Sequence, residues 1–572
     1  MILKALYDYY QRCDNLPRYG MEFKEIGFLL VIDKNGRFIR FEDRRIDKKR
    51  AQQFLVKKSV SRSSNPKANY LYDNSAYVFG YSNKGEANDK RCFETFKACV
   101  ESIHKVHYDN DDIKAIYSFY QNDRESIIDE LKQDQLWEEI EKNLNKKFSF
   151  FSFLIEGDTQ IVAEKTHLIL ENDTKESINE KICIISGIRS QIVKTTTATM
   201  IPNSQATAKL VSFQTDSGYD SYGKSQGQNA PIGKEAEFAY TTALNHLLRP
   251  DSRNKFLIGN RTFVFWASSN NEASQKSEDC LFNLFTFNDV PADNPNQGVE
   301  QVRKVFEAIY SGVLQTSLDD KFYILGLAPN SARIAVAYWA EIPLKDFAER
   351  IIRHFNDMQV FDDRKDKKPY MGLYAILSAV TLGGKVSDVT PNLPEATAKS
   401  IFEGIQYPYP LYSGCIRRIR AEQSLTITRV AIIKAYLNRL NNNEQKIKIM
   451  LDNQNTNQGY LCGRLFAVLD KIQQEANNQH SIKERYMNSA SATPASVFST
   501  ILNLSSHHSE KLNEGRKIYF EKVKQEIIDK IDADGFPSHL DLQDQGRFFV
   551  GFYHQQKAFY TKEEEQNESN NN

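Results

Sequence analysis

The spacing of apolar residues changes along this chain, and the change limits the folds it can form. Before about residue 343 the apolar segments are short and rich in β-branched and aromatic residues, as in FLLVI (28–32) and RTFVFWA (261–267). Beyond it they recur at helical intervals, as at Phe347, Ile351 and Phe355. Short segments of this composition predict strands, and recurrence every three to four residues predicts amphipathic helices. We therefore predict an α+β protein, with a mixed, strand-rich N-terminal and central region followed by an α-helical bundle.

Local patterns predict individual elements of the first region. The segment MILKALYDYYQR (1–12) places its apolar residues on one face of a short helix. The run IGFLLVI-DKNG-RFIRF (26–41) predicts a β-hairpin that turns at Asn35-Gly36. Residues 109–144 predict an acidic, solvated helical segment. Two further segments are predicted as strands, THLILEN (166–172) and KICIISG (181–187).

The charged run DDRKDKKPY (362–370) is the clearest break between the two regions. It predicts a first domain over residues 1–361 and a helical bundle over residues 370–562. The tail EEEQNESNNN (563–572) has almost no apolar residues and is predicted to be disordered.

Cysteine usage and hydropathy indicate a reducing compartment. The seven cysteines form no CxxC pair and no framework spacing, which argues against disulfides. The N-terminus lacks the apolar core of a signal peptide. No apolar run approaches the roughly 20 residues that span a bilayer. We expect a cytoplasmic protein with no membrane partner.

The net charge is zero, with 74 basic and 74 acidic residues, but the charges are segregated. Residues 34–67 contain twelve basic residues and three acids, and residues 413–449 contain eight basic residues and two acids. Such runs create local positive fields that attract phosphate backbones although the average charge is neutral. The alternative is a set of ordinary solvated surfaces.

The segment KKSVSRSSNPKANYLYDNSAY (57–77) mixes cations, amides and tyrosines. Cations neutralise phosphates, and short amides can hydrogen-bond base edges. The Asn65-Pro66 pair predicts a loop. The alternative is a solubilising loop whose tyrosines pack inward. The residues that we predict to contact a nucleic-acid duplex are Lys57, Lys58, Arg62, Lys67, Asn69 and Asn74.

The segment SYGKSQGQNAPIG (221–233) has the composition of a linker, but it lies between a strand-like and a helix-like segment. We therefore predict an ordered loop that enters a helix. Lys224 would approach a phosphate, and Gln226, Gln228 and Asn229 would donate to a nucleic-acid edge. The alternative is that these amides only cap and brace neighbouring loops.

In the second region, CIRRIRAEQ and RVAIIKAYLNRL carry cations at helical spacing. Guanidinium groups in such an array can follow a nucleic-acid strand. As single residues they are more often surface charges. The predicted contacts are Arg417, Arg420 and Lys434, with Arg429 and Arg439 in the same array.

The sequence offers no convincing catalytic constellation, and we predict no cofactor. No HExxH motif is present, and the GGK run at residues 383–385 lacks the upstream glycine and the following Ser or Thr of a phosphate-binding loop. His104 and His107 form an HxxH pair near acidic residues, but the pair has no partner at a recognised zinc spacing. A metal-dependent nuclease is therefore one alternative, and a purely structural assembly subunit is another.

Nine segments, taken in order, resemble one family, the large subunit of the type I-C CRISPR-associated Cascade surveillance complex. The resemblance runs from residue 1 to about residue 562. The chain departs from it at IRSQIVKTTTATMIPNSQATAKLVSF (188–213), where a shorter stretch richer in glycine and arginine is expected. The nine segments are MILKALYDYYQR, SYGKSQGQNAPIGKEAEFAYTTALNHLL, GNRTFVFWA, LGLAPNSARIAVAYW, YPYPLYSGCIRRIRAEQ, ITRVAIIKAYLNR, NTNQGYLCGRLFAVLDKIQ, SASATPASVF and GRFFVGFYHQ.

The resemblance implies a non-catalytic subunit that binds DNA. It implies that residues 1–361 recognise a protospacer-adjacent motif in the target duplex and serve complex assembly, while the bundle stabilises the R-loop. The implied partners are the guide RNA, the backbone, handle-binding and small subunits, the target duplex with its displaced strand, and a recruited helicase–nuclease. In this family the C-terminal region is also made separately as the small subunit, and Met450 is the candidate internal start.

Overall fold

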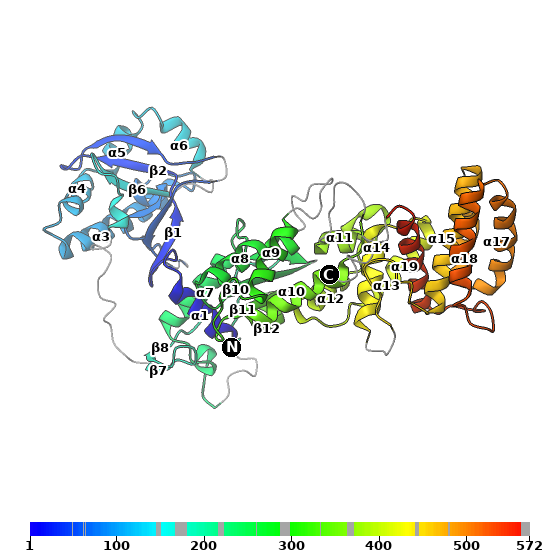
Figure 1. The fold of residues 1–572 in the computed structure, drawn as a ribbon. Helices are drawn as coiled ribbons and strands as arrows, with labels where there is room; N and C mark the ends of the chain where they lie inside the picture. The colour runs from blue at the N-terminus through cyan, green and yellow to red at the C-terminus, as the bar shows by residue number, and fades with distance from the viewer. Residues whose placement is uncertain are drawn as a thin grey trace. The chain divides into compact units, whose positions relative to one another are not determined.

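The structure, a computed structural model, describes residues 1–47, 50–60, 62, 65–144, 150–165, 180–215, 222–258, 260–285, 298–331, 333–362, 371–440, 445–478 and 481–561. Several sheets and many helices make up these residues, so the predicted α+β class is confirmed (Figure 1). The chain forms two compact units. The loop-bearing unit comprises Cys13–Thr197 and Phe213–Ala243, and the bundle unit comprises Met1–Arg12, Ala198–Ser212 and Leu244–Asn572.

A four-stranded sheet with the order β3-β2-β6-β5 forms the centre of the loop-bearing unit. Strand β2 is buried along its whole length, which explains its continuously apolar sequence. It pairs antiparallel with β3 and parallel with β6. The predicted hairpin is confirmed, and Gly36 turns it with a φ of +82° that glycine adopts without strain. The strands are β2 (Phe28–Ile32), β3 (Phe38–Asp43), β5 (Tyr72–Asn74) and β6 (Phe150–Ile155).

Helices complete the core of this unit (Figure 1). The predicted helical segment 109–144 is confirmed as three helices. They are not merely solvated, because Ile116 and Leu131 are fully buried on their inner faces. A separate two-stranded ladder carries the loop after residue 57. These elements are α2 (Ser75–Val78), α3 (Glu86–Val106), α4 (Asp111–Phe119), α5 (Arg124–Leu131), α6 (Trp137–Asn143), β1 (Met21–Glu25) and β4 (Gln53–Lys57).

The rest of the unit contains short elements. The predicted strand 181–187 ends early, because the chain turns tightly after Ile182, where the Gly187 N–H donates to the Cys183 carbonyl at 2.9 Å. The predicted strand 166–172 lies outside the described residues. The elements are η1 (Val162–Glu164), β7 (Glu180–Ile182), β8 (Arg189–Gln191), η3 (Gln226–Asn229) and α7 (Lys234–Leu247), whose last turn belongs to the bundle unit.

The bundle unit contains a second, fully antiparallel sheet with the order β12-β11-β10-β9. The predicted N-terminal helix is confirmed as α1, and the segment RTFVFWA forms β10. Three helices pack their apolar faces in the core with this sheet. The elements are α1 (Ile2–Arg12), β9 (Lys255–Ile258), β10 (Arg261–Ala267), β11 (Lys321–Asn330), β12 (Arg333–Pro343), α8 (Glu272–Phe285), α9 (Val299–Tyr310) and α10 (Leu344–Met358).

The predicted bundle continues from this sheet as a run of helices that share its hydrophobic core. The Phe402 ring lies 6.2 Å from Phe256 and 4.9 Å from Phe285, measured between ring centroids. Residues 363–370 and 563–572 lie outside the described residues, so the predicted boundary and disordered tail stay predictions. The helices are α11 (Leu373–Ser378), η4 (Leu382–Gly384), η5 (Val386–Asp388), α12 (Leu393–Glu403), α13 (Tyr409–Glu422), α14 (Ile427–Arg439), α15 (Gln458–Asn477), α16 (Ser481–Ala490), α17 (Pro494–Ser509), α18 (Glu514–Ile528) and α19 (Leu542–Ala558).

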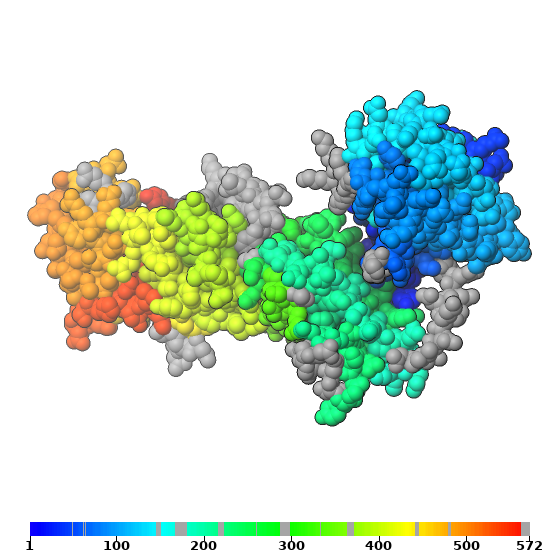
Figure 2. Space-filling view, turned by 180° about the vertical axis from the view of Figure 1, so that it is seen from behind, coloured from blue at the N-terminus to red at the C-terminus, as the bar shows by residue number. Residues whose placement is uncertain are grey.

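Helices α15 and α19 approach each other closely. A Cβ added at Gly463 would overlap the Phe548 carbonyl oxygen, so the two backbones can touch only because this residue is glycine. The Tyr412 hydroxyl also donates to the Leu542 carbonyl at 2.6 Å. In Figure 2 the yellow and the orange-red parts of the chain form adjoining surfaces.

Candidate nucleic-acid interface

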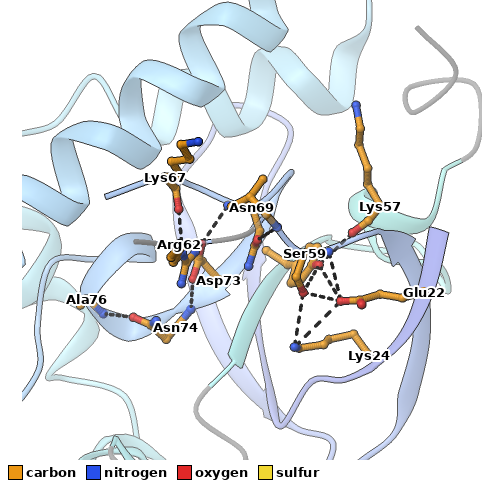
Figure 3. A network of polar contacts seen from close by, with 12 residues as sticks. Glu22, Lys24, Lys57, Ser59, Arg62, Lys67, Asn69, Asp73, Asn74 and Ala76 are labelled. Carbon is orange, nitrogen blue, oxygen red and sulfur yellow. Dashed lines mark hydrogen bonds and ion pairs between the residues drawn. The ribbon is translucent and has the colours of Figure 1, made fainter. Parts of the chain in front are cut away.

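The loop between β4 and β5 begins on a rigid ladder. The Lys58 N–H donates to the Gly20 carbonyl at 2.7 Å, and the Tyr72 hydroxyl donates to the Lys57 carbonyl at 2.8 Å. Ser59 donates through both its N–H and its hydroxyl to the Glu22 carboxylate (Figure 3). The start of this loop is therefore fixed by backbone and side-chain bonds.

Asp73 organises the middle of the loop (Figure 3). Its side chain is fully buried, forms an ion pair with Arg62 and accepts a 2.9 Å hydrogen bond from the Asn69 N–H. Burial raises the pKa of the Asp73 carboxyl, and Arg62 opposes this shift. The Arg62 Nε also donates to the Lys67 carbonyl at 2.8 Å, and its guanidinium lies 4.2 Å from the centre of the Tyr77 ring.

These contacts correct the prediction for Asn69, which is buried, and they give Arg62 and Asn74 partners within the loop, so their contact with a nucleic acid stays a prediction. Arg62 is the counter-ion of Asp73, so its guanidinium is engaged within the loop. Asn69 is 2% exposed, and its Oδ1 accepts from the Val60 N–H at 2.9 Å. The Asn74 side chain caps α2 by accepting from the Ala76 N–H at 3.2 Å. All three brace the loop, because a polar loop needs internal partners for its backbone and buried charge.

The lysines of the loop remain at its surface. Lys58 and Lys67 are exposed, and Lys57 is half-buried. The Lys57 Nζ lies 4.9 Å from the centre of the Tyr70 ring. Figure 3 shows Lys57 and Lys67 extending away from the Asp73 network. Tyr72 and Tyr77 are buried, which agrees with the alternative that the tyrosines of this loop pack inward. The loop is thus braced from inside and cationic outside.

The second predicted loop lies in the same unit, and Lys58 of the first loop contacts the helix that follows it. The Lys58 Nζ lies 5.3 Å from the ring centre of Phe238 on α7, the helix that residues 222–233 enter. Neither end of this loop is a boundary between units. The prediction of an ordered loop entering a helix is therefore confirmed for the residues from 222 onward.

The amides of this second loop mostly brace it. The Gln228 Oε1 accepts from the Ser225 N–H at 3.2 Å, and the Asn229 Nδ2 donates to the Gln226 carbonyl at 3.0 Å. The Asn229 bond uses one of the two amide hydrogens of this half-buried residue, so its contact with a nucleic acid stays a prediction. Gln226 is half-buried with a φ of +47° at the start of η3. Lys224 is exposed, as the prediction requires.

A cavity of about 290 Å³ adjoins this loop. Lys181 and Lys194, which the sequence prediction missed, contribute its two cations. The prediction missed them because they are isolated lysines in different segments, and only the fold brings them to one cavity. The cavity is lined by Lys181, Ile192, Val193, Lys194, Ser225 and Gln228.

In the bundle unit, the structure separates the predicted cations. Arg417 is exposed on α13 and Arg420 is half-buried, and both line an open hollow of about 430 Å³ with Ser413 and Leu542. The Arg420 Nη1 donates to the Gln545 Oε1 at 3.4 Å. These two arginines remain accessible to a ligand.

Lys434 is a correction. It is 3% exposed, and its Nζ donates to the carbonyls of Asn356 and Asp357 at 3.3 and 3.0 Å. Burial lowers its pKa to about 8. Arg429 and Arg439 are also buried and pair with Glu422 and Asp357. The reason is that α14 is buried almost all round, so its cations bind carbonyl and carboxylate groups of neighbouring helices.

The HxxH pair does not form a metal cluster. His104 stacks on Tyr117 with ring centroids 4.1 Å apart. Among the described residues, no group of three or more histidine, cysteine, aspartate or glutamate side chains is placed to hold a metal ion. Within the same part of the chain, no helix is both long and apolar enough to cross a membrane.

The described residues thus present a braced loop with lysines at its surface on one unit, and two accessible arginines on the other. Comparison with protein families identifies the class of the chain. The family of CRISPR-associated proteins described as Cas_Csd1 matches residues 6–560. The chain therefore belongs to this CRISPR-associated family. No curated protein matches the chain.

Proposed function

We propose that this chain is the non-catalytic, DNA-binding large subunit of a type I-C Cascade surveillance complex. In this role it recognises the protospacer-adjacent motif in the target duplex, helps to unwind it, stabilises the R-loop and recruits a helicase–nuclease. Pairing between guide and target reads the remaining sequence, so the protein needs only short-motif contacts and electrostatic attraction. Its partners are the guide RNA, the other Cascade subunits and the target DNA.

The 57–74 loop carries this proposal. Lys57, Lys58 and Lys67 present ammonium groups on a loop whose backbone is held by the Glu22 and Asp73 contacts. A rigid cationic loop loses little conformational entropy on binding, and each phosphate contact releases counterions. Because Asn69 is buried and the Asn74 side chain caps α2, the lysines of the loop supply mainly phosphate contacts. Such contacts set position and affinity more than sequence preference.

The test uses the assembled complex and a duplex library with a randomised motif. We expect the wild-type complex to enrich one short motif. The triple variant Lys57→Ala, Lys58→Ala, Lys67→Ala should weaken binding to all sequences and reduce the slope of log K against log salt by about 0.9 for each lysine that contacts a phosphate. A matched triple variant at Lys84, Lys90 and Lys105, exposed lysines of the same unit, should leave the slope unchanged.

If the two triple variants had equal slopes of log K against log salt, the lysines of the loop would not contact DNA phosphates. Absence of any enriched motif with the wild-type complex would instead favour a purely structural subunit. Incubating the purified chain with DNA and Mg²⁺ or Mn²⁺ tests the nuclease alternative, which requires cleavage that His104→Ala abolishes.

A further inference from the structure

The Lys181–Lys194 cavity is built by three segments that backbone bonds hold together. Lys181 lies on β7, Ile192–Lys194 follow β8, and Ser225 and Gln228 belong to the loop before α7. The Gly227 N–H donates to the Lys194 carbonyl at 3.1 Å, and the Val193 N–H donates to the Ile232 carbonyl at 3.0 Å.

The approach of these segments is close. A Cβ added at Gly227 would overlap the Val193 carbonyl oxygen, so the contact requires glycine. The cavity is therefore formed by the fold itself, before any ligand enters.

The lining of the cavity has the chemistry of an anion site. It combines two lysines with Gln228 and with Ser225, whose hydroxyl accepts from the Gln228 N–H and keeps its own hydrogen, and within the described residues it contains no carboxylate. The Gln228 Oε1 is already used by the Ser225 N–H, which leaves the Nε2 group as the hydrogen-bond donor of this side chain. Lysine ammonium, hydroxyl and amide donors together match the oxygens of a phosphate group.

The size of the cavity favours a small group. Its volume of about 290 Å³ lies near the lower limit of typical small-molecule sites, roughly 300 Å³. Ile192 and Val193 add an apolar wall, against which a sugar can pack. One phosphate with its attached sugar fits this description better than a large organic ligand.

We propose that the Lys181–Lys194 cavity binds one backbone phosphate of a nucleic-acid strand. The inference rests on the proposed function and extends it to a second contact point in the loop-bearing unit. It also gives a role to part of residues 188–213, where the chain departs from the family pattern, because Lys194 lies within that segment.

The experiment measures binding of the full-length chain to a fluorescein-labelled duplex and to a labelled single strand over a range of salt concentrations. The double variant Lys181→Ala, Lys194→Ala should reduce the salt slope by about 0.9 on a duplex, or about 0.7 on a single strand, for each phosphate that it no longer neutralises. The control Lys84→Ala, Lys90→Ala removes the same charge from exposed positions of the same unit and should leave the slope unchanged. Lys181→Arg, Lys194→Arg should retain most of the wild-type slope, because it keeps the charge.

A second arm separates a strand phosphate from free phosphate. Isothermal titration of the chain with sodium phosphate should show no binding at concentrations at which DNA binds. Saturable phosphate binding that the double variant abolishes, with unchanged DNA slopes, would overturn the assignment to nucleic acid. Wild-type binding with equal slopes for all variants would overturn the cavity proposal alone, whereas failure of the wild-type chain to bind either DNA would overturn the proposed function as well.

Discussion

The 57–74 loop and the α13–α14 helix pair look alike in sequence, since both are rich in cations. The cations of the two regions differ in their exposure to solvent. In the loop Lys58 and Lys67 are exposed, Lys57 is half-buried, and Arg62 pairs with the buried Asp73. In the helix pair Arg417 is exposed, while Lys434 on α14 is buried. The role of a cation is therefore set by the burial of its backbone element and by the acceptors nearby.

The physical reason lies in the two elements. A polar loop cannot form regular ladders, so it uses a few side chains as internal partners and leaves the others in water. Helix α14 is surrounded by other helices, so a cation on it has to reach a carbonyl or carboxylate inside the protein. Charge runs therefore indicate an interface only where the element itself is exposed.

Removing Arg62 should change the protein most. Arg62→Ala leaves the Asp73 carboxylate buried without its counter-ion, which costs on the order of 3 kcal/mol of unfolding free energy. Urea unfolding followed by tryptophan fluorescence measures it. Arg91→Ala, which removes an exposed arginine of α3, is the matched control and should stay within about 0.5 kcal/mol of wild type. Equal stabilities would mean that Arg62 is free for a partner after all.

The second effect is a pH dependence from Lys434. Its folded pKa of about 8 lies below the ordinary 10.5, so between these values the unfolded chain binds a proton that the folded chain does not. The free energy of unfolding of the wild type should therefore rise with pH over this interval, relative to Lys434→Met, by on the order of 3 kcal/mol. Parallel stability curves for the two proteins across this pH interval would contradict the buried position.

The third test separates the two kinds of cation in the helix pair. Arg417→Ala with Arg420→Ala should weaken R-loop formation by the assembled complex and lower its salt slope by about 0.7 for each single-strand phosphate that these arginines neutralise. Unfolding stability should change little, because both side chains line an open hollow. Lys434→Met should instead change the unfolding stability and leave R-loop formation unchanged. Permanganate footprinting of the displaced strand measures R-loop formation. If Lys434→Met lost R-loops at unchanged stability, Lys434 would be a nucleic-acid contact and not a structural cation.

Asn74 should show the mildest change. Asn74→Ala removes the cap of α2 and should cost about 1 kcal/mol, whereas Asn74→Asp keeps an acceptor and should restore most of it. Motif preference in the library experiment should be the same for the alanine variant and the wild type. A changed preference would show that Asn74 reads a base, as the sequence alone predicted.

Much of the fold could be predicted because it depends on local patterns. The turn at Asn35-Gly36, the buried strand 28–32 and the helices after residue 343 each follow from spacing and composition within a few residues. The early end of the strand predicted at 181–187 could not be predicted from local patterns. A turn closed by the hydrogen bond between the Gly187 N–H and the Cys183 carbonyl replaces ladder pairing there.

For the candidate site, the sequence indicates regions of the chain, and the contact of these regions with a nucleic acid stays a prediction. The sequence indicated the loops at 57–74 and 221–233, and the exposed Lys58, Lys67 and Lys224 agree with it. Nothing in it showed that Asn69 and Asn229 are braces, because an amide that reads a base and an amide that holds a loop have the same local sequence. Nor does the sequence show that Lys181 and Lys194 line the same cavity.

The amino-acid sequence was sufficient for the fold class, the family and the positions of the cationic segments, since each depends on residues close together in the chain. Packing between distant segments settled which cations are available to a partner. Whether Arg62 meets Asp73, or Lys434 meets the end of α10, depends on segments up to 78 residues apart. The free energy of burying a charge is set by those contacts and not by its neighbours in sequence.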